Sequence, residues 1–232
     1  MGIVTIKNGS GLPKYRQIVN SIEKAIAEGT LKKGNKLPSL NSIKNKHNVS
    51  RDTVLTAFND LKTRGIVESI VGKGYYVLSE NVQIHHKIFL LFDEFNSFKE
   101  DLYNSFIETL GVNIQVDLFF HHFNTRVFSN LINDNLGDYS YYVVMPANID
   151  NTERVINRLP HDKVFILDQT NDRLNQYPAV YQNFEKDIFK GLEKVDPLLK
   201  KYNKLILLFE PKKQPQGILK GFKLFCESYN YN

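Results

Sequence analysis

The chain has 232 residues, of which 42% are hydrophobic, so it can bury a core of one or two domains. Its single cysteine, Cys226, excludes an internal disulfide and fits a reducing compartment. The N-terminus lacks the long apolar core of a signal peptide, and no apolar run approaches the roughly 18 residues of a membrane span. We therefore expect a cytoplasmic protein without a membrane partner.

Positive charge is concentrated in the first third of the chain. Residues 1–80 contain 13 Lys and Arg against 6 Asp and Glu, a net charge of +7, whereas the remainder contains 17 and 19, a net charge of −2. Such a concentration is the electrostatic footprint of phosphate contact. The sequence predicts a DNA-binding domain over residues 1–80 and a second domain over residues 81–232.

The first part of the chain carries the start and stop signals of three helices. The first helix begins near Pro13 and stops at Gly29, with apolar residues at helical spacing between them. Ser39 and Ser50 are the predicted N-caps of the second and third helices, because a serine hydroxyl accepts a hydrogen bond from a free backbone N–H. Gly65 ends the third helix. Two strands, 66–70 and 75–77, follow and are joined by residues 71–74.

This order of elements predicts a winged helix-turn-helix, whose third helix reads the major groove from its N-terminal residues. Arg51 can fork onto guanine O6 and N7, and Thr53 can reach a base or a phosphate. Backbone N–H groups near Ser39 can bind phosphate, helped by the helix dipole. Gly72 and Gly74 leave room for Lys73 to approach the minor groove.

The segment resembles the DNA-binding domain of GntR-family bacterial transcription regulators. The resemblance rests on the spacing of the Leu37-Pro38-Ser39 and Val49-Ser50-Arg51-Asp52-Thr53-Val54 stretches and of Gly72-Lys73-Gly74. It implies a double-stranded DNA operator as partner. Early in the second helix, where many members carry an arginine, this chain has Asn41. The predicted DNA-contacting residues are Ser39, Asn41, Ser50, Arg51, Thr53, Gly72, Lys73 and Gly74.

The second domain alternates apolar runs with helical patterns. A run such as Ile88–Phe92 suits a strand buried on both faces, and strands separated by helices imply a mainly parallel α/β sheet. The expected strands are 88–92, 112–120, 141–145, 164–167 and 205–209. The expected helices are 99–110, one through 127–136, one ending at 155–159, 183–194 and 215–229.

Polar side chains follow the strands of this domain, at the edge where ligands of parallel sheets bind. Asp93, Asp168 and Gln169 are the predicted effector-binding residues. Four aromatic residues are further candidates for stacking on a sugar: Phe95, Phe98, Tyr142 and Tyr181. The element order resembles LacI-type regulators and periplasmic-binding proteins, with Phe165-Ile166-Leu167-Asp168 and residues 216–222 as matching pieces. The resemblance implies a small effector, a sugar, and a domain that dimerises.

A two-lobed domain of that family is longer than residues 81–232, so we expect this domain to be incomplete. Three alternatives stay open: a GntR regulator with a smaller, β-rich HutC-type ligand domain, an α/β enzyme fused to a DNA-binding module, and a DNA-binding architectural or replication protein with no small ligand. No nucleophile elbow or phosphate-binding loop is present, and the pairs His85-His86 and His121-His122 lack metal-site spacing. We predict a homodimeric regulator, acting as a repressor, that is not an enzyme and has no metal or cofactor.

Overall fold

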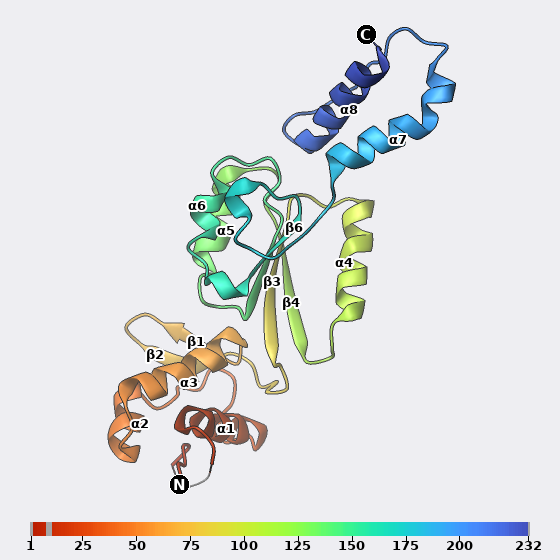
Figure 1. Cartoon of the computed structure of the whole chain (residues 1–232). Helices are drawn as coiled ribbons and strands as arrows, with labels where there is room; N and C mark the ends of the chain where they lie inside the picture. The colour runs from red at the N-terminus through yellow and green to blue at the C-terminus, as the bar shows by residue number, and fades with distance from the viewer. Residues whose placement is uncertain (1, 8–10, 232) are drawn as a thin grey trace. The chain divides into compact units, whose positions relative to one another are not determined.

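The computed structural model describes residues 2–7 and 11–231. Its N-terminal part is a winged helix-turn-helix, as predicted (Figure 1). Three helices precede a two-stranded antiparallel hairpin, whose register runs from Val67↔Val77 to Ile70↔Gly74. The elements are α1 (Lys14–Ala27), α2 (Leu40–His47), α3 (Arg51–Thr63), β1 (Val67–Ile70) and β2 (Gly74–Val77).

The helix boundaries follow from local hydrogen bonds. The Ser39 hydroxyl accepts from the backbone N–H of Ser42 at 3.1 Å, and the Ser50 hydroxyl accepts from that of Thr53 at 3.0 Å. Both serines therefore act as the expected N-caps. The predicted start of the first helix is off by one position. Pro13 is the N-cap of α1 rather than its first residue.

The core of this domain is built from the inner faces of α1 and α3. Ile18, Ile22, Phe58 and Leu61 are all completely buried. The Phe58 ring meets the ring of Tyr75 from the hairpin edge-on, with 4.7 Å between centroids. Burial of these faces holds the wing against the helices.

Arg64 fastens the segment that leaves the winged helix. It follows α3 directly and is 8% exposed. Its guanidinium pairs with Glu23 at 2.6 Å and with Asp60 at 3.0 Å. It also donates to the carbonyls of Val82 (3.3 Å) and Ile84 (2.8 Å). A planar fork with five donors can satisfy several acceptors at once, so one side chain ties α1, α3 and the following chain together.

The second part of the chain forms the mainly parallel sheet that the sequence predicts. The strand order is β4-β3-β5-β6-β7, and β5 pairs with β6, and β6 with β7, in parallel. The first strand is buried from Ile88 to Phe92, as expected for a strand covered on both faces. The strands are β3 (His86–Phe92), β4 (Ile114–Phe120), β5 (Tyr141–Val144), β6 (Val164–Asp168) and β7 (Ala179–Tyr181).

Helices connect several of these strands, and two further helices come after the last strand in the sequence. Figure 1 shows α4 (Ser97–Thr109) on one side of the sheet, with α5 (Thr125–Asp134) and α6 (Thr152–Ile156) on the other. Two more helices, α7 (Phe184–Leu199) and α8 (Gln216–Tyr229), pack so closely that a Cβ at Gly221 would collide with the α7 backbone. Among the described residues, no helix has both the length and the apolarity needed to cross a bilayer.

Two strand predictions differ from the structure. The strand predicted over 205–209 is wrong, because this segment is irregular and leaves Ile206 74% and Leu208 86% exposed. An apolar run becomes a strand only where a neighbouring strand supplies hydrogen bonds, and no described strand pairs with it. Conversely, β7 was not predicted, since its three residues carry too short a pattern. It exists through its pairing with β6, in which Ile166 lies opposite Ala179.

Replacing Arg64 by alanine should destabilise the winged helix by about 2 kcal/mol, because it leaves two part-buried carboxylates and two carbonyls without their donor. Urea denaturation of the full chain measures this change. Arg16→Ala is the matched control, since Arg16 reaches the same Asp60 at 3.8 Å from a side chain that is 43% exposed. The control should change stability by less than about 0.5 kcal/mol. Equal losses in the two variants would contradict the assigned role of Arg64.

Candidate DNA-contacting surface and effector cavity

A hollow of about 260 Å³ lies where the starts of α2 and α3 meet the wing. Five of the eight predicted DNA-contacting residues line it: Ser39, Asn41, Arg51, Lys73 and Gly74. Residues from three separate elements are thus brought to one surface. Lys36 and Tyr75 also line the hollow and were not among the predicted contacts. Their position depends on how the wing folds back, which local sequence signals do not specify.

The other three predicted residues flank this hollow in sequence. Ser50 and Thr53 are engaged with each other, since their hydroxyls lie 2.8 Å apart at the start of α3. Arg51, between them, is exposed. Gly72 forms the turn of the wing at φ +73°, a conformation that side chains disfavour. The first turn of α3 therefore presents Arg51 to solvent while Ser50 and Thr53 stabilise the turn.

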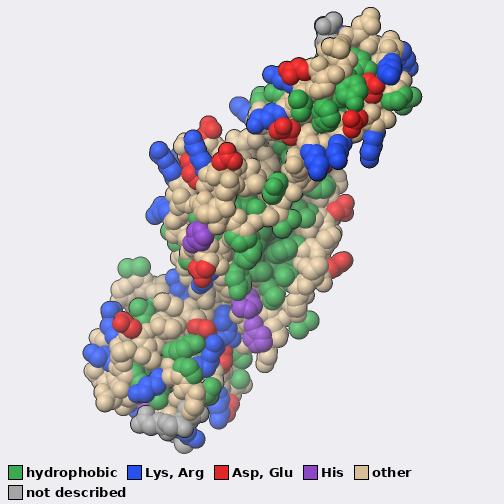
Figure 2. All heavy atoms as spheres, in the orientation of Figure 1, with side chains coloured by type: hydrophobic (Ala, Val, Ile, Leu, Met, Phe, Trp, Pro, Cys, Tyr) green, Lys and Arg blue, Asp and Glu red, His purple; other side chains and the backbone are tan. Residues whose placement is uncertain are grey.

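The visible face of the winged helix is rich in basic side chains. Figure 2 shows Lys and Arg spread across this domain, with few acidic groups among them. Lys36 and Lys73 lie on the hollow itself, beside Arg51. A surface of this charge attracts a phosphate backbone at long range.

A second hollow, of about 300 Å³, lies at the carboxyl ends of the sheet strands, and we call it the small cavity. All three predicted effector residues, Asp93, Asp168 and Gln169, line it. They come from the ends of β3 and β6, so the structure brings together residues 75 positions apart. The other lining residues are Glu94, Asn96, Phe98, Lys99, Phe123, Gln182, Phe184, Lys213 and Pro215.

A buried ion group forms one wall of the small cavity. Lys99, from the first turn of α4, donates to Asp168 at 2.9 Å and lies 3.5 Å from Asp93. The three residues are 5%, 8% and 5% exposed, in that order. Asp168 also accepts from Gln182 at 3.0 Å. Sequence reasoning missed Lys99 and Gln182, because one lysine on a helix and one glutamine after a short strand carry no distinguishing signal.

The strand ends at this edge hold strained backbone. Phe123, Ala147 and Asp168 adopt positive φ values of 55°, 50° and 71° although none is glycine. Buried His121 ties two of these ends together, since one ring nitrogen lies 3.0 Å from the carbonyl of Met145 and the other accepts from Phe123 N–H at 3.1 Å. Burial lowers the pKa of His121, so its ring is neutral at pH 7. Strain of this kind is concentrated at functional sites.

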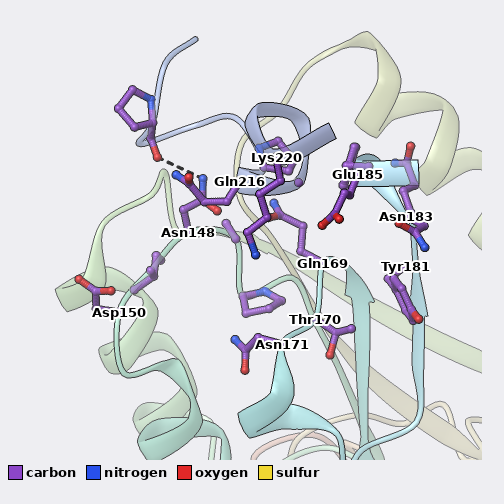
Figure 3. A pocket seen from close by; sticks show the side chains of 18 residues that line it. Asn148, Asp150, Gln169, Thr170, Asn171, Tyr181, Asn183, Glu185, Gln216 and Lys220 are labelled. Carbon is purple, nitrogen blue, oxygen red and sulfur yellow. Dashed lines mark hydrogen bonds between the residues drawn. The ribbon is translucent and has the colours of Figure 1, made fainter. Parts of the chain in front are cut away.

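Figure 3 shows a larger hollow of about 550 Å³, which we call the large cavity and which adjoins the small one. The two share four lining residues: Gln169, Gln182, Phe184 and Pro215. The side chain of Asn148 is used structurally, since its amide donates to the carbonyls of Pro211 and Gln214. The Thr170 hydroxyl is buried and has no hydrogen-bond partner within the described part of the chain.

The four aromatic residues predicted to stack on a sugar lie in different environments. Phe98 lines the small cavity and Tyr181 the large one. Phe95 is 61% exposed, packs on Phe120 and lines neither cavity. The prediction for Tyr142 is wrong, because this residue is completely buried in the core and cannot stack on a ligand. Alternation along a strand cannot tell which face of the sheet a helix will cover.

Comparison with known proteins bears on the first of these sites. Residues 14–77 match the family model described as bacterial regulatory proteins, gntR family. This segment of the chain belongs to the GntR family. The match spans the three helices and the wing, which carry the predicted DNA contacts.

Curated relatives match a part of the chain. The chain is 40% identical over 97 residues to the mannosyl-D-glycerate transport/metabolism system repressor MngR of Escherichia coli, covering 42% of this chain and 38% of that protein. It is 32% identical over 81 residues to the transcriptional repressor YtrA of Bacillus subtilis, covering 35% of this chain and 62% of that protein. The chain therefore spans less than two thirds of either relative. Both are transcription regulators, in agreement with the prediction that the chain is not an enzyme.

Solved structures are similar to a part of the chain. YtrA of Sulfolobus acidocaldarius, a GntR-family transcription factor, is 29% identical and covers 46% of this chain and 99% of its own, with a TM-score of 0.32. The DNA-binding domain of AraR in complex with operator ORR3 is 32% identical and covers 32% of this chain and 88% of its own, with a TM-score of 0.29. TM-scores this low carry no weight for the fold of the remaining residues.

Lys99→Met should destabilise the sheet domain by about 3–5 kcal/mol, because it leaves two buried carboxylates facing each other without a cation. Thermal unfolding at pH 7 measures the loss. Lys213→Met is the control, since its partner Glu94 is solvent-accessible, and we expect little change there. A Lys99→Met protein as stable as the parent would contradict the ion group.

Proposed function

We propose that the protein is a transcription regulator of the GntR family that binds a DNA operator through residues 1–80 and a small effector through residues 81–232. The observation that carries the DNA-binding half is the hollow where Ser39, Asn41, Arg51, Lys73 and Gly74 converge, inside the segment that matches the family. The proposal includes a cytoplasmic location, which the single cysteine supports. The names of two relatives support repression as the mode of action.

Three kinds of contact make up the proposed operator complex. Arg51 reads a guanine in the major groove from the first turn of α3, with Ser50 and Thr53 beside it. Ser39 and Asn41 bring the start of α2 to a phosphate. Lys73, between Gly72 and Gly74, enters the minor groove from the wing.

The second domain is proposed to bind its effector in the two adjoining cavities, as in the periplasmic-binding-protein and LacI-type domains that the element order resembles. Their place beyond the carboxyl ends of parallel strands supports this, since ligands of such sheets bind there. Asp93, Asp168 and Gln169 are the proposed contacts, and their carboxylate and amide groups suit the hydroxyls of a sugar. Coupling requires that the effector binds one DNA-binding state of the protein more tightly than the other.

A homodimer completes the proposal. Regulators with this kind of domain bind two half-sites about one DNA turn apart, which requires two copies of the third helix. The sheet domain is the proposed site of dimerisation.

Arg51→Ala should weaken operator binding by about 1–3 kcal/mol and relax the preference at one base pair, because a bidentate contact is lost. Binding to the operator and to single-base variants of it measures both effects. Arg126→Ala removes the same charge from exposed α5 and should leave binding unchanged. Unchanged operator affinity in Arg51→Ala would refute the assignment of α3 as the reading helix.

Lys73→Ala should weaken binding to all DNA sequences similarly and reduce the slope of log affinity against log salt by about 0.9, the contribution of one phosphate. Affinities at four salt concentrations, on operator and random duplexes, measure this. Lys190→Ala, on the exposed side of α7, is the control. A loss confined to the operator duplex would contradict a wing–backbone contact.

The direct test is fluorescence anisotropy of the full chain on duplexes from its own upstream region, across salt and with a panel of sugars. The proposal expects tight, site-specific binding that one sugar releases without being converted. Weak, sequence-independent binding that no sugar changes would overturn it.

A further inference from the structure

We propose that the effector carries a positively charged amine, so that the small cavity binds a hydroxylated primary amine of the amino-sugar class in preference to a neutral sugar. This inference rests on the proposed effector-binding function and names the class of ligand. Its starting observation is the imbalance of charge in the two cavities.

Carboxylates outnumber ammonium groups along the cavity walls. Five carboxylates line the two cavities: Asp93, Glu94, Asp150, Asp168 and Glu185. Three ammonium groups accompany them: Lys99, Lys213 and Lys220. The cavities are therefore net negative in a protein whose formal net charge is +5. His121, the buried histidine beside them, is neutral and leaves the imbalance unchanged. An anionic ligand is disfavoured by this field, and a cationic one is attracted.

Ion pairs account for two of the five carboxylates, and Asp93 is the buried one among the remaining three. Lys213 pairs with Glu94 at 2.8 Å, and Lys99 donates to Asp168 at 2.9 Å. Asp168 is further satisfied by Gln182. Asp93 uses its Oδ1 to accept from Glu94 N–H at 2.7 Å, while its Oδ2 has only the 3.5 Å approach of Lys99 within the described chain.

Asp93 Oδ2 is thus the weakest-partnered oxygen of the group, on a side chain that is more than nine-tenths buried. A buried carboxylate is costly unless a cation or strong donors complete its shell. A ligand ammonium placed in the small cavity would supply that cation. The resulting charge-assisted hydrogen bond is stronger than one from a neutral hydroxyl.

The remaining lining residues of the cavities suit the sugar ring and hydroxyl groups of an amino sugar. Phe98, Phe123 and Phe184 supply apolar surface on the small cavity, whose 300 Å³ matches the lower end of ligand-sized sites. Gln169 offers an amide at the junction of the two cavities (Figure 3). An amide both donates and accepts, as recognition of sugar hydroxyls requires.

The test is isothermal titration calorimetry of the full chain at pH 6.5, where the ligand amine is protonated. The probes are D-glucosamine, D-galactosamine and D-mannosamine, each against its parent hexose and its N-acetyl derivative. Both partners keep the ring and are uncharged, since the hexose carries a hydroxyl in place of the amine and the N-acetyl derivative carries an amide. We expect at least one hexosamine to bind ten times more tightly than both of its neutral partners. The inference is overturned if no hexosamine does so.

Variants locate the charge that is responsible. Asp93→Asn should lower the affinity for the preferred hexosamine at least tenfold while leaving the weaker affinity for the parent hexose unchanged. Glu100→Gln removes one negative charge from an exposed site next to Lys99 and should have no effect. If Asp93→Asn does not fold, Asp168→Asn serves instead, because asparagine tolerates the positive φ of this position. Retention of full hexosamine affinity in the folded variant would contradict the inference.

The outcomes separate this inference from the proposed function. A neutral hexose could bind as tightly as the corresponding hexosamine and release the operator. That result would support the proposed regulator function and contradict the preference for an amine. Operator binding that changes with none of these probes would contradict both the amine preference and the proposed sugar effector. The proposed DNA-binding function of residues 1–80 would be unaffected.

Discussion

The buried ammonium of Lys99, held between the carboxylates of Asp93 and Asp168, is the interaction on which the sheet domain depends. It joins the start of α4 to the ends of β3 and β6. Because two buried anions share one cation, the group is incompletely neutralised. The same contact that fixes the strand ends therefore leaves negative charge on the cavity wall. If the proposed ligand site is correct, structural stabilisation and ligand recognition use the same set of buried charges, whose desolvation is costly.

The winged helix depends on a different kind of interaction. Its elements are defined by short-range hydrogen bonds, such as those from the Ser39 and Ser50 hydroxyls, and by a compact core centred on Phe58. Arg64 then fixes the chain that leaves it. The surface so formed is basic around Arg51 and Lys73, while the cavities of the sheet domain are net negative. If the proposals for the two sites hold, the two halves of the regulator select partners of opposite charge, a polyanion at one and a cation at the other.

Prediction from the sequence succeeded where the determinants are local. Ser39, Ser50 and the glycines of the wing act within a few residues of themselves, so their effect can be seen in the linear pattern. Asp93 and Asp168 could be named as candidates because each directly follows an apolar run and parallel strands end at one edge. Their shared partner could not, since Lys99 lies 69 residues from Asp168 and nothing in its surroundings distinguishes it from other lysines.

The sequence by itself determined the winged helix, the alternation of strands and helices, and the concentration of positive charge in residues 1–80, because these depend on periodicity, capping and composition. Only the tertiary structure decided which apolar segments became strands. Residues 205–209 had the pattern but no neighbouring strand, whereas β7 had little pattern but a partner in β6. It also decided that Tyr142 is core rather than cavity wall, and that Lys99 is buried between two carboxylates. The physical reason is that a ladder of hydrogen bonds, a buried face and an ion group each require a second segment, whose approach is a property of the folded chain.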